Sequence, residues 1–221
     1  MKFQRARSEE QKTIRIQQIL ASANELLNQY PYKDITMDMI AEGLQFSRAN
    51  IARYASSKEE IFMKLYLEDM LAVCEELIGK CREKGELGIS EFAALFAGIC
   101  AGHTNFIRLG AILDTIIEMN IKVERLAEYK KTMLLKIEDV VQQLLIQFPF
   151  LTYETACEIV SILTRYLAGL YPGGHQSPVQ KEAIRLSGIP YHEEDFHTSL
   201  IRFIEILLSG YQALYSKHPA Q

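Results

Sequence analysis

Hydrophobic positions recur with a period near 3.6 residues in almost every segment of the chain. Runs of alternating β-branched residues bounded by turn signals are missing. This pattern predicts an all-α fold, because it is the spacing of an amphipathic helix and not of a strand. The first stripe stops just before Pro31, where a helix should already have ended. Its members are Ile16, Ile19, Leu20, Ala23, Leu26, Leu27 and Tyr30.

The same pattern predicts the remaining helices and one loop. Two short apolar pieces, residues 36–43 and 47–54, precede a long helix that runs from about Ser57 to about Cys81. Two-turn helices are too short to be stable alone, so these pieces must pack on their neighbours. Residues 171–180, which include two Gly and two Pro, are expected to be a loop before a weakly structured stretch. Further helices are expected over 89–145, in three pieces with breaks around 102–105 and near Asn120, over 153–170 and over 195–215.

Three of the early helix starts carry a hydroxyl residue. Thr36, Ser47 and Ser57 can each accept a hydrogen bond from a first-turn amide, and Ser57 with Glu60 matches the S-x-x-E capping box. Lys58 follows, although the partial positive charge of a helix start disfavours a cation. A Lys at this position makes sense if it helps to hold a phosphate. A solvated Lys tolerated at an exposed helix end is the alternative.

The piece that begins at Ser47 has the composition of a helix that contacts base edges. Ile51 faces the core, and the other positions carry hydrogen-bond donors or small side chains. Arg and Asn can bond guanine and adenine bidentately from the first turns of a recognition helix. The outward residues are Arg48, Ala49, Asn50, Arg53 and Tyr54.

Residues 35–62 resemble the helix-turn-helix signature of the tetracycline-repressor (TetR) family. That signature has Thr at the second-helix cap, then Ile-Ala, a Ser that opens the recognition helix, an aromatic near its end, and Ser-Lys-Glu at the fourth helix. This chain matches it without insertion or deletion, and departs from the family at Gln45, in place of the usual turn Gly, and at Ala52 and Ala55. The matching residues are Thr36, Ile40-Ala41, Ser47, Tyr54 and Ser57-Lys58-Glu59.

The resemblance implies an amino-terminal three-helix DNA-binding domain, residues 1–56, and a larger helical ligand-binding and dimerisation domain, residues 57–221. It implies a cytoplasmic transcriptional regulator, usually a repressor. Such a protein binds a palindromic operator in double-stranded DNA as a homodimer and is released by a small-molecule effector. We expect no cofactor, no bound metal and no association with a membrane. The expected DNA contacts are Thr36, Ser47, Arg48, Ala49, Asn50, Arg53, Tyr54 and Lys58.

Two other function classes stay open. An all-α enzyme, ligand carrier or interaction module could contain a helix-turn-helix that is only architectural, and a regulator could respond to a protein partner instead of a metabolite. The sequence contains no G-x-S-x-G, no H-E-x-x-H and no phosphate-binding loop. We therefore predict no catalytic residue and no enzyme activity.

The distribution of charge changes what the net charge of −4 implies. An acidic protein is a poor partner for nucleic acid. Residues 1–58, however, hold nine Lys or Arg and six Asp or Glu, a balance of +3, whereas residues 59–221 hold fifteen and twenty-two, a balance of −7. Lys2, Arg5 and Arg7 add a basic arm that could follow phosphates or enter the minor groove; a solvated tail is the alternative.

The last two predicted helices carry more apolar surface than a helix wetted on one side requires. This surplus predicts a twofold subunit interface, which the resemblance also implies. A helix wholly buried within one chain is the alternative, and Ile201 and Ile206 fall outside the stripe. The expected interface residues are Ile159, Leu163, Tyr166, Leu200, Phe203, Leu207 and Tyr211.

Residues 103–125 are expected to have a solvent-exposed face, which includes Arg125, and an apolar row on the opposite face. His103 and Asp114 are the polar members of that row. A buried carboxylate needs a partner, so the two residues are candidate contacts of an unknown ligand. Groups satisfied within the core or at a helix end are the alternative.

Cysteine and histidine positions predict neither disulfides nor a metal site. Cys74, Cys81, Cys100 and Cys157 lie in apolar helical sequence and are expected to be reduced thiols. Cys74 and Cys81 could form a redox pair between subunits, but we favour a core placement. His192 and His197 do not share a helical face, which argues against a metal. The sequence shows no signal peptide and no apolar run of membrane-spanning length.

Overall fold

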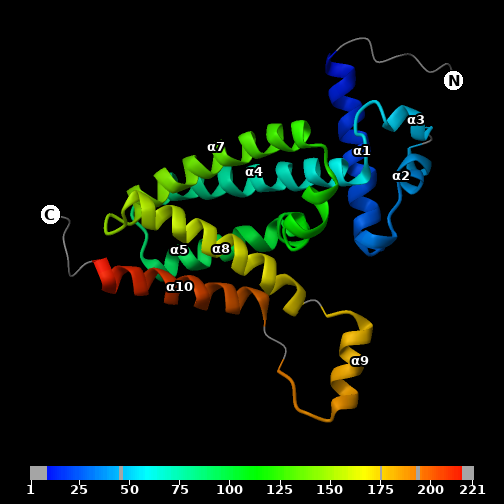
Figure 1. Ribbon diagram of the computed structural model, residues 1–221. Coiled ribbons are helices and arrows are strands. Elements are labelled where there is room, and N and C mark those ends of the chain that lie inside the picture. The colour runs from blue at the N-terminus through cyan, green and yellow to red at the C-terminus, as the bar shows by residue number, and fades with distance from the viewer. Residues whose placement is uncertain (1–8, 45–46, 175, 193–194, 216–221) are drawn as a thin grey trace.

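The computed structural model describes residues 9–44, 47–174, 176–192 and 195–215, and it is helical throughout (Figure 1). The described residues contain no strand, which confirms the predicted all-α class. The elements are α1 (Glu9–Gln29), η1 (Tyr32–Asp34), α2 (Met37–Gly43), α3 (Arg48–Ile51), α4 (Lys58–Lys84), α5 (Ile89–Gly102), α6 (Thr104–Gly110), η2 (Leu113–Ile117), η3 (Glu118–Asn120), α7 (Val123–Gln147), α8 (Tyr153–Gly174), α9 (Pro178–Ser187) and α10 (Phe196–Tyr215).

The short helix α2 packs against α1 and α3 packs against α2, at one end of the molecule, while α1 itself packs against α4 (Figure 1). Ile40 and Ile51 are fully buried in the shared core. Gly43 lies so close to α1 that an added Cβ would come within 2.8 Å of the Ser22 hydroxyl oxygen, and that hydroxyl donates to the carbonyl of Ile40. This close approach explains a glycine inside α2. The packing supplies the stability that two-turn helices lack alone.

Part of the apolar stripe of α10 faces the chain's own core, where we predicted a subunit interface. Leu200 and Ile159 are fully buried within the single chain, and Leu163 is only 7% exposed, because α10 packs against α5 and α8. The expectation for these three residues is therefore wrong. The other four, Tyr166, Phe203, Leu207 and Tyr211, are half-buried.

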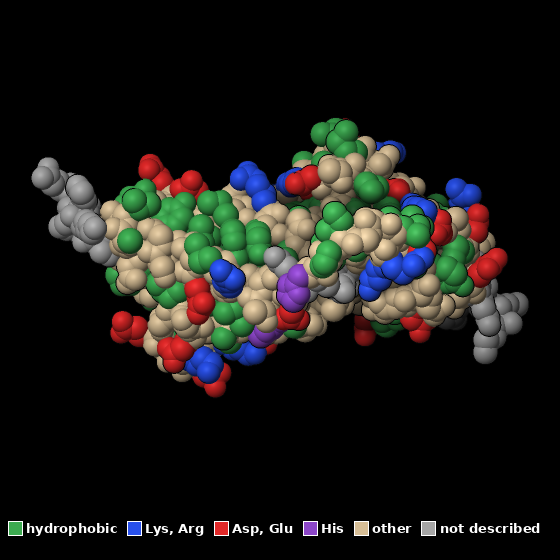
Figure 2. Space-filling view, turned by 90° about the horizontal axis from the view of Figure 1, so that it is seen from below, with side chains coloured by type: hydrophobic (Ala, Val, Ile, Leu, Met, Phe, Trp, Pro, Cys, Tyr) green, Lys and Arg blue, Asp and Glu red, His purple; other side chains and the backbone are tan. Residues whose placement is uncertain are grey.

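The outward surface of α10 is also partly apolar. Ile206, which fell outside the predicted stripe, is 63% exposed. Figure 2 views the molecule from below and shows hydrophobic side chains gathered over the half that contains α10. Between α8 and α10, the rings of Tyr166 and Phe203 stack with centroids 3.6 Å apart. The half-buried aromatic residues therefore lie beside an exposed apolar face.

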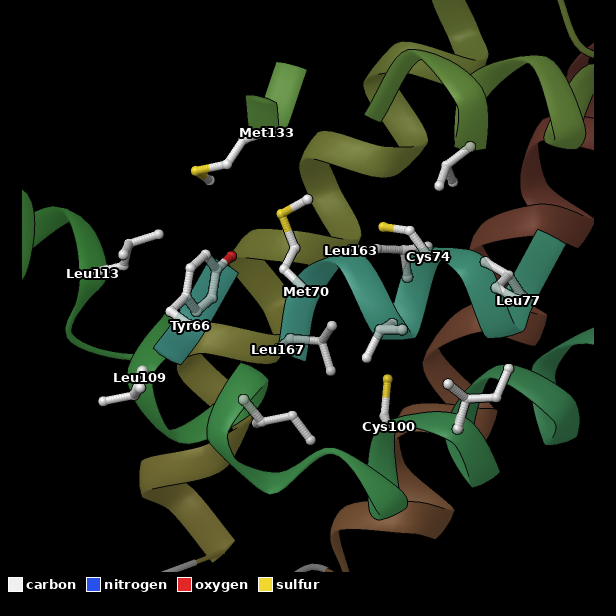
Figure 3. Close-up of a cluster of buried hydrophobic side chains, with 14 of the residues drawn as sticks. Tyr66, Met70, Cys74, Leu77, Cys100, Leu109, Leu113, Met133, Leu163 and Leu167 are labelled. Carbon is white, nitrogen blue, oxygen red and sulfur yellow. The ribbon is translucent and has the colours of Figure 1, made fainter. Parts of the chain in front are cut away.

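The helix α4 is the central element of the second part of the chain, with α5, α6 and α7 packed around it. Its inward side chains join those of α6, η2, α7 and α8 in one apolar cluster (Figure 3). Two methionines, Met70 and Met133, belong to this cluster, and Met side chains adapt to irregular spaces. The labelled members are Tyr66, Met70, Cys74, Leu77, Cys100, Leu109, Leu113, Met133, Leu163 and Leu167.

A helix forms where we expected a loop and a weakly structured stretch. The helix α8 continues through Pro172 to Gly174, and α9 covers residues 178–187. Ser177 caps α9 in a capping box with Gln180, Pro178 occupies a first-turn position, and Gly188 ends the helix with φ of +68°. These residues punctuate helices as readily as they form loops. The Gly and Pro content of the segment therefore misled the prediction.

In the part of the chain that the structure describes, no single helix is long and apolar enough to cross a membrane. The helices α5 and α6 reach such a length only as a pair that is bent by 85°. Both helices contribute buried side chains to the core.

Candidate DNA-binding surface and the junction behind it

The starts of α2 and α3 are capped as the sequence predicts. The Thr36 hydroxyl accepts a hydrogen bond from the Met39 amide at 3.2 Å, and the Ser47 hydroxyl accepts one from the Asn50 amide at 3.2 Å. Both capping residues have extended backbone and are exposed. Each hydroxyl keeps its own O–H donor for a group outside the protein.

The helix α3 presents a polar surface that is anchored from behind by Ile51. Arg48, Ala49 and Arg53 are exposed, whereas Asn50 is half-buried. The Arg48 guanidinium lies 3.7 Å from the Asp38 carboxylate of α2, and both side chains are more than 60% exposed. An ion pair this exposed contributes about 0–1 kcal/mol to stability, so Arg48 can exchange Asp38 for another anion at little cost.

Lys58 is occupied inside the protein, contrary to our prediction of a free phosphate-binding cation. Its ammonium donates to the carbonyls of Tyr32, at 3.2 Å, and Ile35, at 2.8 Å, and lies 4.7 Å from the centre of the Tyr32 ring. The Tyr32 carbonyl also accepts from the Ile35 amide at the end of η1, at 3.3 Å, so the cation adds to the bonds that end this short helix. Lys58 therefore fastens η1 to the start of α4.

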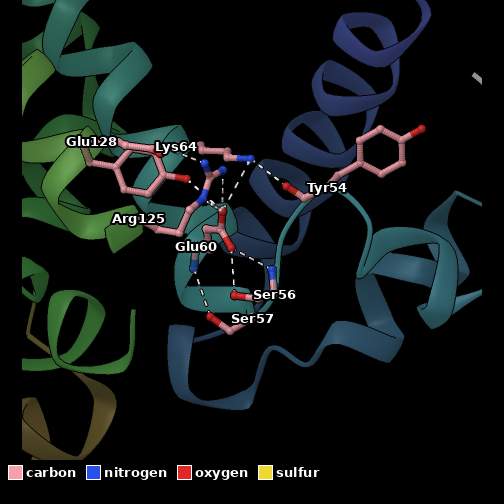
Figure 4. Close-up of polar contacts among 8 residues, drawn as sticks. Tyr54, Ser56, Ser57, Glu60, Lys64, Arg125 and Glu128 are labelled. Carbon is pink, nitrogen blue, oxygen red and sulfur yellow. Dashed lines mark hydrogen bonds and ion pairs between the residues drawn. The ribbon is translucent and has the colours of Figure 1, made fainter. Parts of the chain in front are cut away.

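A buried carboxylate behind the DNA-binding helices makes the most extensive set of polar contacts at this junction (Figure 4). The Glu60 side chain is 4% exposed. Its Oε2 atom accepts from the Ser56 amide at 2.7 Å and from the Ser56 hydroxyl at 2.9 Å. Its Oε1 atom accepts from Arg125 Nε and Nη2 at 3.1 and 3.0 Å and from the Tyr129 hydroxyl at 3.1 Å, with Lys64 Nζ at 3.9 Å.

The predicted capping box at this helix start is only half formed. Ser57 accepts from the Glu60 amide at 3.3 Å, as expected. The Glu60 carboxylate, however, bonds to Ser56 and not to the amide of Ser57. Arg125, which we placed on the wet face, turns inward to reach Glu60 from α7. The sequence contained no signal for this contact, because the two residues are 65 positions apart.

Lys64 extends this network to the turn that follows α3. Its ammonium donates to the Tyr54 carbonyl at 2.8 Å, while the Tyr54 ring points away from the Glu60 cluster (Figure 4). The first two turns of α4 thus hold the DNA-binding part through Tyr54 and Ser56, and hold α7 through Arg125. A displacement of α7 relative to α4 must disturb the same carboxylate that fixes Ser56.

The charge of Glu60 is maintained despite its burial. Burial alone would raise the pKa of its carboxyl, but the hydrogen bonds from Ser56 and Arg125, together with the charge of Lys64, outweigh this effect and lower the pKa below its usual value. Burial lowers the pKa of Lys64. Glu60 is therefore ionised at neutral pH, as a carboxylate that accepts this many donors should be.

His103 and Asp114 do not lie on one apolar row, as we predicted for these candidate ligand contacts. The helix breaks after Gly102, and η2 is a π-helical turn, so the continuous apolar row from 103 onward does not exist. His103 is half-buried at the break, with Nδ1 3.5 Å from Asp69 and Nε2 3.1 Å from Glu76, both on α4. Asp114 is exposed on η2. His103 is thus satisfied at a helix end, which was the alternative.

The remaining sequence candidates have structural explanations or lie outside the described residues. Burial raises the pKa of Cys74 to about 11 and also raises that of Cys81, so both thiols stay protonated and unreactive at neutral pH. The described residues contain no group of three or more His, Cys, Asp or Glu that could hold a metal ion. Lys2, Arg5, Arg7 and Gln45 lie outside the described residues.

Two family models together match most of the chain. Residues 19–65, which include α2, α3 and the Glu60 junction, match the model described as "Bacterial regulatory proteins, tetR family". Residues 67–214 match the model described as "Tetracyclin repressor-like, C-terminal domain". The chain belongs to the TetR family. The two matches meet inside α4, so this helix is common to both parts of the TetR architecture.

Solved structures of TetR-family proteins share the fold. A possible TetR family transcriptional regulator from Streptomyces coelicolor A3(2) has a TM-score of 0.62 at 14% identity, over 90% of this chain and 99% of that one. The TetR family repressor AlkX from Dietzia sp. strain DQ12-45-1b has a TM-score of 0.54 at 13% identity, over 90% and 95%. The fatty acid degradation regulator FadR from Bacillus halodurans has a TM-score of 0.53 at 14% identity, over 88% and 95%. No curated protein matches the sequence.

Replacing Glu60 should give this TetR-family protein a pH-dependent loss of stability. The folded-state pKa of Glu60 is lowered, so its contribution is present above the unfolded pKa of about 4.3 and is lost as the pH falls through the folded pKa. Glu60→Gln should lower the free energy of unfolding by about 3 kcal/mol at pH 7. Denaturant unfolding measured from pH 7 to pH 3 should show the gap to the wild type closing as the pH falls.

Glu128→Gln is the matched control, because Glu128 also pairs with Arg125 but its side chain is 64% exposed. It should change the stability by about 1 kcal/mol at most. A gap between Glu60→Gln and the wild type that stays constant over this pH range would contradict the role assigned to the Glu60 charge.

Proposed function

We propose that this TetR-family protein is a transcriptional repressor that binds a palindromic operator as a homodimer and leaves it when a small apolar molecule binds. The observation that carries the proposal is the α3 surface, which has exposed donors in front, a fully buried Ile51 behind, and a rigid polar junction at Glu60. The domain division at residues 56 and 57 is part of this proposal, with α4 as the shared element.

The proposed DNA surface differs from our sequence-based set in one residue. Arg48, Ala49, Asn50, Arg53 and Tyr54 would face the major groove or its edges, with the hydroxyls of Thr36 and Ser47 on phosphates. Lys58 is left out because two carbonyls hold its ammonium. Ala49 leaves room for a close approach to the bases, and Arg53 provides an exposed fork of donors.

Selection from random DNA duplexes at low salt should enrich a pseudo-palindrome, because a twofold dimer presents two recognition helices to two half-sites. Arg53→Ala should weaken binding of the selected duplex. If Arg53 contacts a base, the loss is about 1–3 kcal/mol with relaxed specificity; if it contacts a phosphate, the slope of log affinity against log salt falls by about one. Fluorescence anisotropy over a salt series measures both quantities.

Arg82→Ala, at an exposed position near the end of α4, is the control and should leave the duplex affinity unchanged. A selection that enriches no palindrome at low salt would overturn the regulator proposal, as would a chain that turns over a substrate and has no affinity for DNA.

The dimer interface is proposed to lie on the outward faces of α8 and α10. Ile206 and Leu214 of α10 are 63% and 69% exposed, and Arg202, one turn before Ile206, is exposed as well. Ser209, Gly210 and Ala213 continue the same face of α10 with small side chains, which let two helices approach closely. Ile162 on α8 and the half-buried Tyr166 and Phe203 complete the patch. Twofold symmetry makes such a patch self-complementary.

Ile206→Arg should convert the dimer to a monomer, because it places two like charges at the centre of an apolar contact. Leu134→Arg is the matched control, since Leu134 is also 63% exposed and its helix, α7, lies on the opposite side of the bundle from α10. Sedimentation velocity should show a monomer for Ile206→Arg and a dimer for Leu134→Arg. Dimers of equal stability in both variants would place the interface elsewhere.

The proposed effector site is the apolar cluster of Figure 3, between α4, α6, η2, α7 and α8. Its lining favours an apolar or amphipathic molecule, and Met70 and Met133 can make room for one. The wall formed by η2 is an irregular π-helical turn that carries the buried Leu113, and π-turns inside helices are frequent at functional sites. Among the structural neighbours, AlkX is implicated in biodegradation of n-alkanes and FadR is a fatty acid degradation regulator, so both are associated with molecules of this class.

Effector binding would reach DNA through the junction. The turns η2 and η3 lead directly into α7, and Arg125 lies in the first turn of α7. A molecule that pushes η2 away from α4 would shift Arg125 relative to Glu60, and Glu60 holds Ser56 at the base of the DNA-binding part. The ligand must prefer the state that cannot bind DNA, because only differential affinity shifts the equilibrium.

Dodecanoate, used below its micelle concentration as an amphipathic probe, should raise the melting temperature and weaken binding of the selected duplex. A ligand that binds only the folded state stabilises it by RT ln(1 + [L]/Kd). Met133→Phe should reduce both effects by filling the cluster, whereas Leu135→Phe, at an exposed position on α7, should not. Equal responses of the two variants would contradict the proposed effector site. A response to glucose and none to dodecanoate would contradict it as well.

A further inference from the structure

Residues 176–192 form an arm that stands clear of the helix bundle (Figure 1). The arm consists of α9 and the returning segment 188–192, and none of the described residues of α9 is buried. Four large apolar side chains on the arm are more than half exposed: Val179 at 78%, Leu186 at 69%, Ile189 at 70% and Tyr191 at 54%.

The local sequence specifies a helix in this arm, yet the helix lacks the packing that would stabilise it. Ser177 and Gln180 exchange capping hydrogen bonds of 2.8 and 3.3 Å, and Gly188 supplies the left-handed end. A ten-residue helix is marginal in water even with good caps, because most helical stability in proteins comes from packing of an apolar face. The apolar face of α9, which would provide this packing, is not covered by other residues of the same chain.

The exposed apolar residues are placed for docking. Val179, Ala183 and Leu186 follow at i, i+4 and i+7, which puts them on one side of α9. Ile184 lies on another side and lines, with Ile189 and Tyr191 of the returning segment, an open hollow of about 490 Å³ whose rim also includes the charged Lys181 and Arg185. The arm therefore offers a ridge and an adjacent hollow, which together can hold apolar side chains from another surface.

The position of the arm in the fold indicates on which surface its apolar side chains dock. The arm leaves α8 at its end and enters α10 at its start, and the outward faces of these two helices are the proposed dimer interface. A twofold axis over this helix pair brings the partner's body next to each arm, and each body exposes apolar residues such as Ile206 and Leu214 on α10. The recognition helix α3 lies at a different corner of the molecule, so the arm does not extend along the DNA-binding surface (Figure 1).

We propose that the arm, residues 176–192, docks on the second copy of this chain in the dimer. The inference rests on the proposed homodimer and extends it. Val179 and Leu186 pack on the partner's helices, and the symmetric contact forms twice. The two arms thereby add to the affinity of the α8 and α10 faces without further loss of translational freedom. The dimer then orders a helix that the isolated chain cannot stabilise.

Hydrogen exchange detected by mass spectrometry tests the proposal on the full-length protein. The peptide that spans residues 178–191 is followed in wild-type protein above and below the dimer dissociation constant, which sedimentation equilibrium provides. The α9 amides should be protected about 10-fold or more in the dimer and unprotected in the monomer, because an unpacked short helix frays. Ile206→Arg, as a monomer, should show the unprotected rate at every concentration.

Leu186→Glu should raise the dimer dissociation constant about 10-fold to 100-fold, since one large apolar contact is lost twice in the dimer. It should also abolish the protection of α9. Ile146→Glu is the matched control on α7, where Ile146 is 72% exposed, and it should leave both measurements unchanged.

A stable dimer whose α9 amides exchange at the monomer rate, and whose dissociation constant is unaffected by Leu186→Glu, overturns the arm proposal and leaves the proposed function intact. Absence of any dimer overturns both. Protection that arises only when phosphatidylglycerol vesicles are added overturns the proposal in favour of a lipid surface.

Discussion

The arrangement of the two parts of this protein depends on one buried carboxylate. A buried charge is tolerated only when nearly all of its hydrogen-bonding capacity is used. Glu60 meets this requirement with donors from three places: Ser56 at the base of the DNA-binding part, Lys64 on its own helix, and Arg125 and Tyr129 on α7. No one of these elements can move far without leaving the charge unsatisfied. Small displacements of these elements would therefore cost hydrogen bonds to a buried charge. A two-state switch needs such a junction, because intermediate positions are then unfavourable.

The junction also explains why α4 is long and apolar on several sides. At its start it has to present Glu60 and Lys64 to two different neighbours, and further along it has to fill the space between α5, α6 and α7. Tyr66 and Met70, which follow Glu60 on the same helix, already belong to the apolar cluster. A single helix thus connects the packing of the cluster to the hydrogen bonds at the junction. In the proposed mechanism, changes in the cluster would be transmitted over roughly two to three helical turns of α4.

Local signals in the sequence predicted the helix class, most helix bounds and the caps at Thr36, Ser47 and Ser57, because each of these depends on residues within a few positions of one another. Long-range partners could not be predicted in this way. Lys58 and Arg125 were both assigned to solvent or DNA, and both turn inward to groups more than 20 residues away. Asp114 was placed in an apolar row that required a continuous helix, and a π-helical turn at 113–117 breaks that row. The α9 helix was missed because Ser, Pro and Gly mark both loops and helix ends.

The α10 helix shows a limit of a different kind. Its apolar residues cover more than one face, and sequence alone cannot tell which face is buried within the chain and which between chains. Leu200, Ile204 and Leu208 have no exposed surface at all in the single chain, so they have nothing left to offer a partner. The surplus that pointed to an interface is real, but it resides in Ile206 and the small residues beside it. The helix α9 likewise exposes apolar side chains, and none of its described residues is buried in the core. Two neighbouring segments with unused apolar surface, joined in one chain, are explained most economically by a single partner that covers both.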